Sequence, residues 1–377
     1  MKKIKLGDLC KPSQGQIKEQ PDTVIDYIDI SSVDNESKTV TGYQTMTFEE
    51  SPSRARKAVK KGSILVSTVR PNLNAVALLE EDTPNLSVAS TGFCILDCKD
   101  NVDNRFVFNF CKSKPFIDDM VSQATGASYP AVSDKIIRSA LIPAYSYDEQ
   151  RKIGEILDRV SSVVESRKHE LDVLDNLIKA RFVEMSSEWN CQEKPLGDYL
   201  DEITYGFTNP MPDAEEGPWK ITAKDVVDGH INFETARKTA KKSFDALTSK
   251  SKPVIGDVLL TKDGTLGRTA IVEEEGICVN QSVAVLRCNN QVVPRFLSLL
   301  LQLPEYQREM TKNSGGGTIK HIYITKVDKM FVRIPAIDKQ ESFIKFVEQV
   351  DKSKAIVQQA LNETQQLFDK LMQEYFG

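Results

Sequence analysis

The sequence predicts an α+β protein with an internal duplication, in which a globular module followed by a long helix occurs twice. Two observations carry this prediction: ordered motifs that recur at one spacing, and a change from strand-like to heptad periodicity within each half. The motifs recur with offsets between 190 and 194 residues. The matched pairs are Lys5–Leu9 with Pro195–Tyr199, Lys61–Ser67 with Ile255–Thr261, Gly126–Tyr129 with Gly316–Ile319, Leu141–Pro143 with Arg333–Pro335, and Asp148–Gln150 with Asp338–Gln340.

The front part of each half is predicted to consist of short strands and turns. Runs rich in β-branched residues, bounded by Gly, Pro, Asn and Asp, are typical of strands. Shorter helices are expected near residues 104–123 and 294–312. The predicted strands lie within Tyr27–Ile30, Ser63–Val69, Asp257–Thr261, Thr269–Val272 and Ser282–Leu286.

The rear part of each half has the a/d spacing of a coiled coil, with apolar or long side chains alternating four and three residues apart. Each helix is expected to run about 37 residues and to span roughly 55 Å at ~1.5 Å per residue. A single helix would leave its apolar stripe in water, so the two are expected to pack on each other as an antiparallel pair in a pseudo-twofold molecule. The first set of positions is Ile153, Leu157, Val160, Val164, Arg167, Leu171, Leu174, Ile178 and Arg181, and the second is Phe343, Val347, Val350, Lys354, Val357, Leu361, Thr364, Phe368, Leu371 and Tyr375.

This organisation predicts four segments. The first globular domain covers residues 1–145 and the first spacer helix 146–187. The second globular domain covers residues 188–336 and the second helix 337–377.

The composition is that of a globular protein, with 40% hydrophobic and 27% charged residues. No apolar run approaches the ~18–20 residues that span a bilayer, and a cytoplasmic location with no membrane partner is expected. The seven cysteines have no CxxC spacing, which favours reduced thiols. The three histidines are too scattered to suggest a metal site.

The net charge of −5 hides two basic runs. Local positive patches can bind phosphates on an acidic protein, because the field near a surface is short-ranged at physiological salt. The alternative is that each run is a solvated face. The first run contains Arg54, Arg56, Lys57, Lys60, Lys61 and Arg70, and the second contains Arg237, Lys238, Lys241, Lys242, Lys250 and Lys252.

Motifs of catalysis are missing from the sequence. There is no Walker A loop, no G-x-S-x-G elbow, no HExxH and no Rossmann glycine pattern. A loose nuclease pattern through Asp22, Glu36 and Lys38 has no counterpart in the second half. We therefore expect a protein that is not an enzyme; a minimal nuclease and a scaffold that binds only proteins are the alternatives.

Several of these motifs resemble the specificity subunits of Type I restriction–modification systems. The resemblance covers essentially the whole chain and depends on the order of the motifs. The first half departs from the family pattern, with Gln14–Gln16 in place of the Gly-x-Thr-x-Pro turn and Pro71–Asn74 in place of two loop glycines. The matching segments are Leu6–Asp8, Leu196–Asp198, Gly206–Pro210, Tyr27–Ile30, Trp219–Asp225, Gly256–Thr261 with Gly264 and Gly267, Gly317–Ile322, Ile334–Pro335, and Leu141–Pro143 with Glu149–Gln150.

The resemblance implies two target-recognition domains joined by two long antiparallel helices. Each domain would read one half of a split target in double-stranded DNA, and the helices would set the unread gap. It also implies that two methyltransferase subunits dock on the helices and that two restriction subunits, which are motor-nucleases, join the complex. S-adenosylmethionine and ATP would belong to those partners, and no cofactor to this chain.

Three kinds of segment are the candidate DNA contacts: the basic runs, the hairpin loops Arg70–Asn74 and Lys262–Arg268, and the loop before each Ile-Pro motif. Arg can bind guanine O6/N7 bidentately and Asn can bind adenine N6/N7. The alternative is that these are ordinary hairpin turns. The candidates are Arg54, Arg56, Lys57, Lys60, Lys61, Arg70, Asn72, Asn74, Ser128, Tyr129, Lys241, Lys242, Lys262, Thr265, Arg268, Lys312, Asn313, Lys320 and His321.

Polar a/d residues such as Arg167, Arg181 and Lys354 are unusual for an isolated two-helix seam and suggest that a partner covers part of the helices. A dimerisation seam between two chains is the alternative. The candidate partner-binding residues are Leu157, Val164, Leu171, Ile178, Val350, Val357, Leu361 and Phe368.

Overall fold

The computed structural model describes residues 2–13, 15–18, 21–189, 191–227, 229–312 and 321–377. The chain divides into two compact units. Unit 1 comprises Met1–Leu171 and Ile356–Gly377, and unit 2 comprises Asp172–Ala355. In the described part of the chain, none of the helices combines the length and the apolar character needed to cross a membrane.

Unit 1 contains a four-stranded sheet in the order β3-β2-β7-β4, a three-stranded sheet β6-β5-β8 and the pair β1-β9. Strands β2 and β7 are parallel, and the other pairs are antiparallel. Its strands are β1 (Lys3–Lys5), β2 (Val24–Ile28), β3 (Gln44–Thr47), β4 (Ala55–Ala58), β5 (Ile64–Ser67), β6 (Val76–Leu78), β7 (Leu86–Ser90), β8 (Phe93–Leu96) and β9 (Leu141–Pro143). Its helices are α1 (Leu6–Leu9), α2 (Asn104–Lys112), α3 (Lys114–Gln123), α4 (Asp134–Ser139), the start of α5 (Tyr147–Ser187) and the end of α10 (Ile337–Phe376), with the 3-10 turns η1 (Ile30–Ser32) and η2 (Pro71–Leu73).

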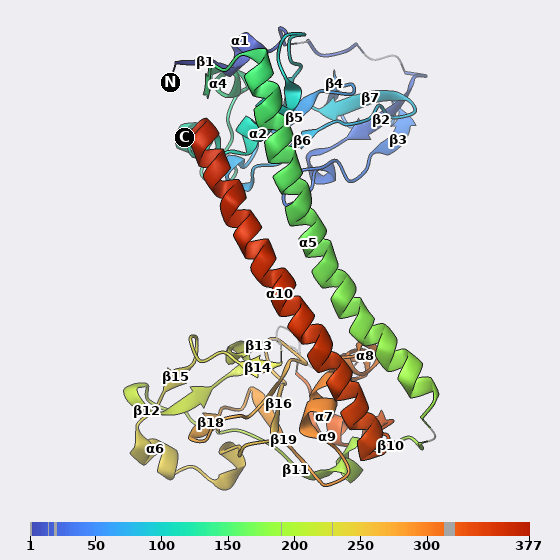
Figure 1. The fold of residues 1–377 in the computed structure, drawn as a ribbon, viewed down its shortest axis with the longest axis vertical. Helices are drawn as coiled ribbons and strands as arrows, with labels where there is room; N and C mark the ends of the chain where they lie inside the picture. The colour runs from blue at the N-terminus through green and yellow to red at the C-terminus, as the bar shows by residue number, and fades with distance from the viewer. Residues whose placement is uncertain (1, 14, 19–20, 190, 228, 313–320) are drawn as a thin grey trace. The chain divides into compact units, whose positions relative to one another are not determined.

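Helix α2 joins the sheets of unit 1 to the two long helices (Figure 1). Its N-cap Asp103 accepts a hydrogen bond from the Phe106 amide at 2.9 Å, which fixes where the helix begins. Phe106 and Phe110 are buried one turn apart, and both contact the ring of Phe376 near the end of α10. Leu157 of α5 belongs to the same hydrophobic cluster. The start of α5 and the end of α10 are therefore part of the core of unit 1.

Unit 2 contains a four-stranded sheet β11-β19-β16-β17, a three-stranded sheet β15-β12-β18, and the pairs β10-β20 and β13-β14. Here β12 and β18 are the parallel strands. Its strands are β10 (Lys194–Pro195), β11 (Leu200–Tyr205), β12 (Ala214–Ile221), β13 (Val226–Val227), β14 (His230–Ile231), β15 (Arg237–Lys238), β16 (Val258–Thr261), β17 (Thr269–Ile271), β18 (Ile277–Val279), β19 (Val283–Cys288) and β20 (Phe331–Val332). Its other elements are α6 (Lys241–Asp245), α7 (Pro294–Leu301), α8 (Pro304–Thr311), α9 (Ile324–Asp328), η3 (Leu196–Tyr199), η4 (Ala223–Asp225) and η5 (Ser249–Ser251).

The core of unit 2 is built around α7 and the ends of the long helices that belong to this unit. The ring of Phe343 in α10 lies 5.4 Å from that of Phe182 in α5 and 6.1 Å from that of Phe296 in α7. All three side chains are buried. Aromatic edge contacts of this kind add to the free energy gained by burial alone.

The repeated Asp-x-Gln motif has a structural explanation in both units. Gln150 accepts a hydrogen bond from the Asp103 amide at 3.1 Å, beside the start of α2. Gln340 accepts one from the Val293 amide at 2.8 Å, beside the start of α7. Both glutamines are buried, and a buried amide donor left unpaired would be costly. Each glutamine thus attaches the first turn of a long helix to the core helix of its unit.

The heptad prediction agrees with the burial of the two helices. Each of the predicted a/d residues of α5 and α10 is buried or half-buried. The polar ones are accommodated by ion pairs: Lys354 lies 2.5 Å from Asp175 within unit 2, and Arg167 lies 2.7 Å from Glu170 within unit 1. The α+β class and the expected strands and helices are confirmed. The predicted four-segment division differs from the compact units, because each unit includes part of both helices.

A buried carboxylate makes the stability of unit 1 sensitive to pH. Asp26 of β2 accepts hydrogen bonds from the Thr45 hydroxyl at 2.7 Å and the Asn85 amide at 2.8 Å. Burial by itself raises the pKa of Asp26, but these hydrogen bonds outweigh it and lower the pKa below its usual value. The stabilisation is therefore present above the unfolded-state pKa and is lost as the pH falls through the lower folded-state pKa.

We expect Asp26→Asn to lower the free energy of unfolding by about 1.5–3 kcal/mol at pH 7, the range for a hydrogen bond to a charged group. The difference from the wild type should shrink as the pH falls below about 4, where the unfolded carboxyl is protonated. Urea unfolding at a series of pH values measures both effects. A pH-independent difference would contradict this account of Asp26.

Candidate nucleic-acid interface

In unit 1 the structure brings two of the predicted DNA-contacting segments together. The hairpin between β5 and β6 contains Arg70, whose amide donates to the Pro130 carbonyl at 2.7 Å. Val69 pairs with Ala131 in an isolated antiparallel bridge. The hairpin loop and the loop before the first Ile-Pro motif therefore form one surface.

This surface opens onto a hollow of about 730 Å³. Arg70 and Tyr129 both line it, and the Arg70 guanidinium carbon lies 5.0 Å from the centre of the Tyr129 ring. Tyr129 is 68% exposed, which is a large exposed fraction for an aromatic residue. Arg54 lines the same hollow and pairs with Asp29 at 2.6 Å. The hollow thus presents two guanidinium groups and an aromatic ring beside the carboxylates of Asp29, Asp34 and Glu36. Asn72 and Ser128 are exposed beside it in sequence.

The backbone of this hairpin loop is left-handed at Arg70 (φ 49°) and Asn74 (φ 48°). Such residues cost of order 1–3 kcal/mol each and tend to occur where the surroundings fix them, often at functional sites. In the described residues, Lys38 (φ 59°) is the one other non-glycine residue with positive φ. Its ammonium donates to the Asn74 carbonyl at 2.6 Å, so all three left-handed residues meet at this loop.

The structure gives a loop-holding role to Asn74, which was predicted to contact DNA, and to Lys38, which belongs to the alternative nuclease pattern. The Asn74 side chain is 7% exposed and donates to the Cys111 carbonyl at 2.9 Å, so it holds the loop and does not reach a base edge in this structure. Lys38, from the nuclease alternative, is likewise committed to the loop, and its burial lowers its pKa. No cluster of three or more His, Cys, Asp or Glu that could hold a metal ion occurs among the described residues.

The first basic run does not form one continuous patch. Lys57 is largely buried and donates to the Phe93 carbonyl and the Asp134 carboxylate, at 2.6 and 2.7 Å. Arg56 donates to the carbonyl of its neighbour Ala55. Lys60 and Lys61 are exposed, but they precede β5, whereas Arg70 follows it. The strand therefore separates them from the hollow that Arg54 and Arg70 share.

Unit 2 also brings its hairpin loop against the loop before the second Ile-Pro motif. The Ile322 amide donates to the Lys262 carbonyl at 2.8 Å. Asp263 lies between Lys262 and His321, 3.0 Å from the Lys262 ammonium and 2.6 Å from His321 Nδ1. Thr265 and Arg268 are exposed on the same loop. Asn313 and Lys320, also predicted to contact DNA, lie outside the described residues.

Sequence reasoning missed two residues of this second surface, Asp263 and Tyr205. The Lys262 ammonium lies 5.3 Å from the centre of the Tyr205 ring. Tyr205 directly precedes the Gly206–Pro210 motif, and its position beside this motif could have marked it as a candidate. Gly206 is required there because a Cβ atom would lie 1.8 Å from the Val279 carbonyl oxygen. The motif thus allows β11 to pass close to β18.

The second basic run adopts a different structure from the first. Arg237 of β15 pairs with Asp213 at 2.6 Å, and Lys238 stacks on Trp219 with its ammonium 4.6 Å from the ring centre. Lys241 and Lys242 belong to the short helix α6, where Lys241 pairs with Asp245. In the first run, Arg56 and Lys57 belong to strand β4, and Lys60 and Lys61 follow that strand. The equivalent position of the two runs in sequence is therefore not matched by equivalent structure.

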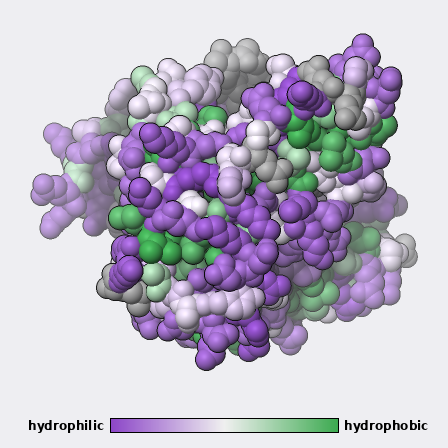
Figure 2. Space-filling view, turned by 90° about the horizontal axis from the view of Figure 1, so that it is seen from above, coloured by the Kyte–Doolittle hydropathy of each residue, from purple (hydrophilic) through white to green (hydrophobic). Residues whose placement is uncertain are grey.

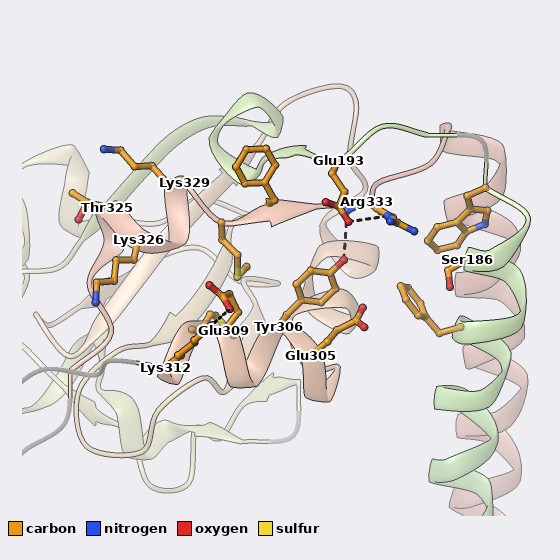
Figure 3. Close-up of a pocket in the computed structure, with 15 residues that line it drawn as sticks. Ser186, Glu193, Glu305, Tyr306, Glu309, Lys312, Thr325, Lys326, Lys329 and Arg333 are labelled. Carbon is orange, nitrogen blue, oxygen red and sulfur yellow. Dashed lines mark hydrogen bonds and ion pairs between the residues drawn. The ribbon is translucent and has the colours of Figure 1, made fainter.

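Lys312 lines another hollow of unit 2, of about 770 Å³, shown in Figure 3. Lys312 lies 4.0 Å from Glu309, and Glu305 projects from the same helix, α8. Glu193 faces them and pairs with Arg333 at 3.0 Å. This hollow is lined by three carboxylates and by four cationic side chains, those of Lys312, Lys326, Lys329 and Arg333. The surface in Figure 2 is also mixed, with hydrophobic patches scattered among hydrophilic side chains.

The model of the Type I restriction modification DNA specificity domain matches residues 1–176 and 211–366. The chain belongs to this family. It is similar to the EcoBI specificity subunit of Escherichia coli, with 24% identity over 286 residues, which cover 67% of this chain and 60% of the relative. It is also similar to the MjaIX specificity subunit of Methanocaldococcus jannaschii, with 23% identity over 147 residues, 38% of this chain and 32% of the relative. The matches thus span 60% and 32% of the length of these relatives.

Two solved structures share the fold of this family member. One, from work on complex assembly and conformational transition of the type I R-M system, has a TM-score of 0.65 at 22% identity and covers 100% of this chain and 97% of its own. The other is the Type I restriction-modification S subunit of M. genitalium, with a TM-score of 0.57 at 14% identity and coverage of 100% and 96%. At these identities the likeness supports the fold.

Proposed function

We propose that this chain is the non-catalytic, DNA-reading specificity subunit of a Type I restriction–modification complex. One observation carries the proposal: in each unit a hairpin loop and the loop before the Ile-Pro motif meet, and together they present cationic and aromatic side chains. In unit 1 these are Arg70 and Tyr129, and in unit 2 Lys262 and His321. Arg54, which precedes β4, lines the same hollow as Arg70 and Tyr129. Two such surfaces in one chain suit a bipartite target in double-stranded DNA.

The two surfaces differ in chemistry. Unit 1 offers guanidinium groups, whereas in unit 2 a carboxylate lies between a lysine and a histidine. Because each base pair presents its own pattern of donors and acceptors in the major groove, unlike side chains select unlike bases. Phosphate contacts supply affinity and its salt dependence, for which exposed Lys60, Lys61 and Lys242 are suited. The two half-sites are therefore expected to differ.

In this proposal α5 and α10 form an antiparallel coiled coil that gives the molecule a pseudo-twofold repeat and sets the gap between the half-sites. Two methyltransferase subunits dock on these helices, and two restriction subunits join the complex. S-adenosylmethionine and ATP are used by those partners, and the assembly acts in the cytoplasm. Exposed apolar side chains on the helices, such as Val173, Val183 and Ile356, are consistent with a covering partner.

Mapping N6-methyladenine across the genome, in cells with and without this chain, tests the function directly. A split, asymmetric motif that disappears with the chain is expected. Methylation that does not depend on the chain, or depends on it without any sequence motif, would contradict the proposal.

Partner docking makes a separate prediction for Leu171 and Leu361. Both are half-buried a/d residues in unit 1. The double substitution of these residues to glutamate is expected to abolish co-purification with the methyltransferase, because a charge is poorly tolerated in an apolar seam. Gln366→Glu, on the exposed side of α10, is the control for added charge. Circular dichroism verifies that the helices persist. Unchanged co-purification of the double variant would refute the docking model.

A further inference from the structure

We infer that Arg70 reads a guanine in the half-site bound by unit 1, and that Lys38 and Asn74 position it. This inference rests on the proposed function and assigns a base class to one of its surfaces. The hairpin loops of the two units share a left-handed backbone conformation but form it with different residues.

The two hairpin loops share their left-handed positions. The loop of unit 1 is closed by a hydrogen bond from the Ser67 amide to the Ala75 carbonyl at 2.8 Å, and that of unit 2 by one from the Thr261 amide to the Arg268 carbonyl at 2.9 Å. In both loops the third residue after the strand and the last residue before closure have positive φ. In unit 2 these are Gly264 and Gly267, and in unit 1 they are Arg70 and Asn74.

Glycine adopts positive φ without steric cost, whereas arginine rarely does. If this segment acted only as a hairpin turn, glycine would be the more favourable residue at position 70, as it is at position 264. The arginine at this position points to a role for its side chain. A strained residue persists where its surroundings determine its conformation, and three contacts do so here.

Each of these contacts fixes a different part of the loop. The Arg70 amide donates to the Pro130 carbonyl at 2.7 Å and the buried Asn74 side chain to the Cys111 carbonyl at 2.9 Å. The Lys38 ammonium reaches the Asn74 carbonyl at 2.6 Å from a different segment of unit 1. Lys38 itself has positive φ and is half-buried. Asn74 and Lys38 act on Arg70 through the backbone and are positioning residues.

The placement of the Arg70 side chain suits a planar partner with two acceptors. The Tyr129 ring centre lies 5.0 Å from the guanidinium carbon, and this cation–π contact helps to hold the side chain in place. Guanine presents O6 and N7 side by side, and a fixed guanidinium can bind both. Arg54 differs, because its guanidinium is already bound to Asp29 at 2.6 Å.

The test is selection from a library of random DNA duplexes by the full-length chain with its methyltransferase, for the wild type, Arg70→Lys and Arg70→Gly. Arg70→Lys keeps the charge but loses the bidentate geometry. Arg70→Gly favours the left-handed backbone and removes the side chain, so the loop should persist. Both variants should lose preference for one guanine of one half-site by about tenfold or more, and the other half-site should be unchanged. Arg151→Lys, an exposed residue of α5 in unit 1, is the matched control.

Variants of Lys38 are tested in the same selection experiment. Lys38→Met should weaken preference for the same guanine, while Lys38→Arg, which can still donate to the Asn74 carbonyl, should restore it. Thermal unfolding is measured alongside, because a merely structural role would lower the melting temperature without changing preference at that one base.

The outcomes separate the two proposals. If the wild type selects no split motif, the proposed function fails and the inference falls with it. If the wild type selects a motif and Arg70→Gly retains every base of it, the inference alone is overturned. A uniform loss of affinity for all sequences in Arg70→Lys would make Arg70 a phosphate contact and would also overturn it.

Discussion

Replacing Phe376 with alanine is expected to lower the free energy of unfolding of unit 1 by about 3–5 kcal/mol, the range for deletion of a buried aromatic side chain. Phe376 is 1% exposed, although it is the next-to-last residue of the chain. Its ring lies 5.3 Å from that of Phe106 and 5.7 Å from that of Phe110. The substitution would leave a cavity where α10 packs on α2, and the last turn of α10 would lose its main attachment.

Urea unfolding followed by circular dichroism measures the effect. Leu367→Ala, on the same helix but 49% exposed, is the matched control and should change the free energy by about 0.5 kcal/mol or less. A loss below about 1 kcal/mol for Phe376→Ala would show that the last turn of α10 is not part of the core of unit 1.

Deleting one heptad from each long helix is expected to shorten the unread gap in the DNA target by about three base pairs. Seven residues at ~1.5 Å shorten a helix by about 10 Å, and base pairs are ~3.4 Å apart. Removing residues 164–170 from α5 and 357–363 from α10 preserves the alternation of four and three in both helices. Both stretches belong to unit 1, next to the point where each helix passes into unit 2.

The motif of methylated adenines in cells expressing the shortened chain measures this effect. Both half-sites should persist, because neither deletion touches a hairpin loop. Deleting three residues from each helix is the control; it breaks the heptad alternation and should abolish methylation without yielding a new gap. If the heptad deletion altered the bases within a half-site, the helices would not be acting as a spacer.

The long helices and the glycine-bounded hairpins are the parts of this fold that the sequence predicts well. Periodicity is a local property, so the a/d residues could be assigned without the fold, and each is at least half-buried. The Asp-x-Gln repeat can also be recognised in the sequence, but its structural role cannot. Only the fold shows that Gln150 and Gln340 accept hydrogen bonds from the amides beside α2 and α7.

The residues of the candidate interface stay a prediction, but the structure does not group them as their order in the sequence suggests. Residues near one another in sequence, Arg54 to Lys61, were grouped into one patch, yet Lys57 points inward to Asp134 and β5 separates Lys60 and Lys61 from Arg70. Strand alternation and long-range ion pairs decide which side chains of a charged run face outward. Neither can be assigned from charge alone.

By itself, the sequence determined the two modules, the strands that build them and the heptad period of the helices, because all of these follow from local patterns of apolar residues and turns. Tertiary structure alone decided how the candidate recognition surfaces are assembled. Arg70 meets Tyr129, and Lys38 meets Asn74, across separations of 59 and 36 residues. Contacts over such separations depend on the packing of whole sheets and loops, and no local pattern specifies them.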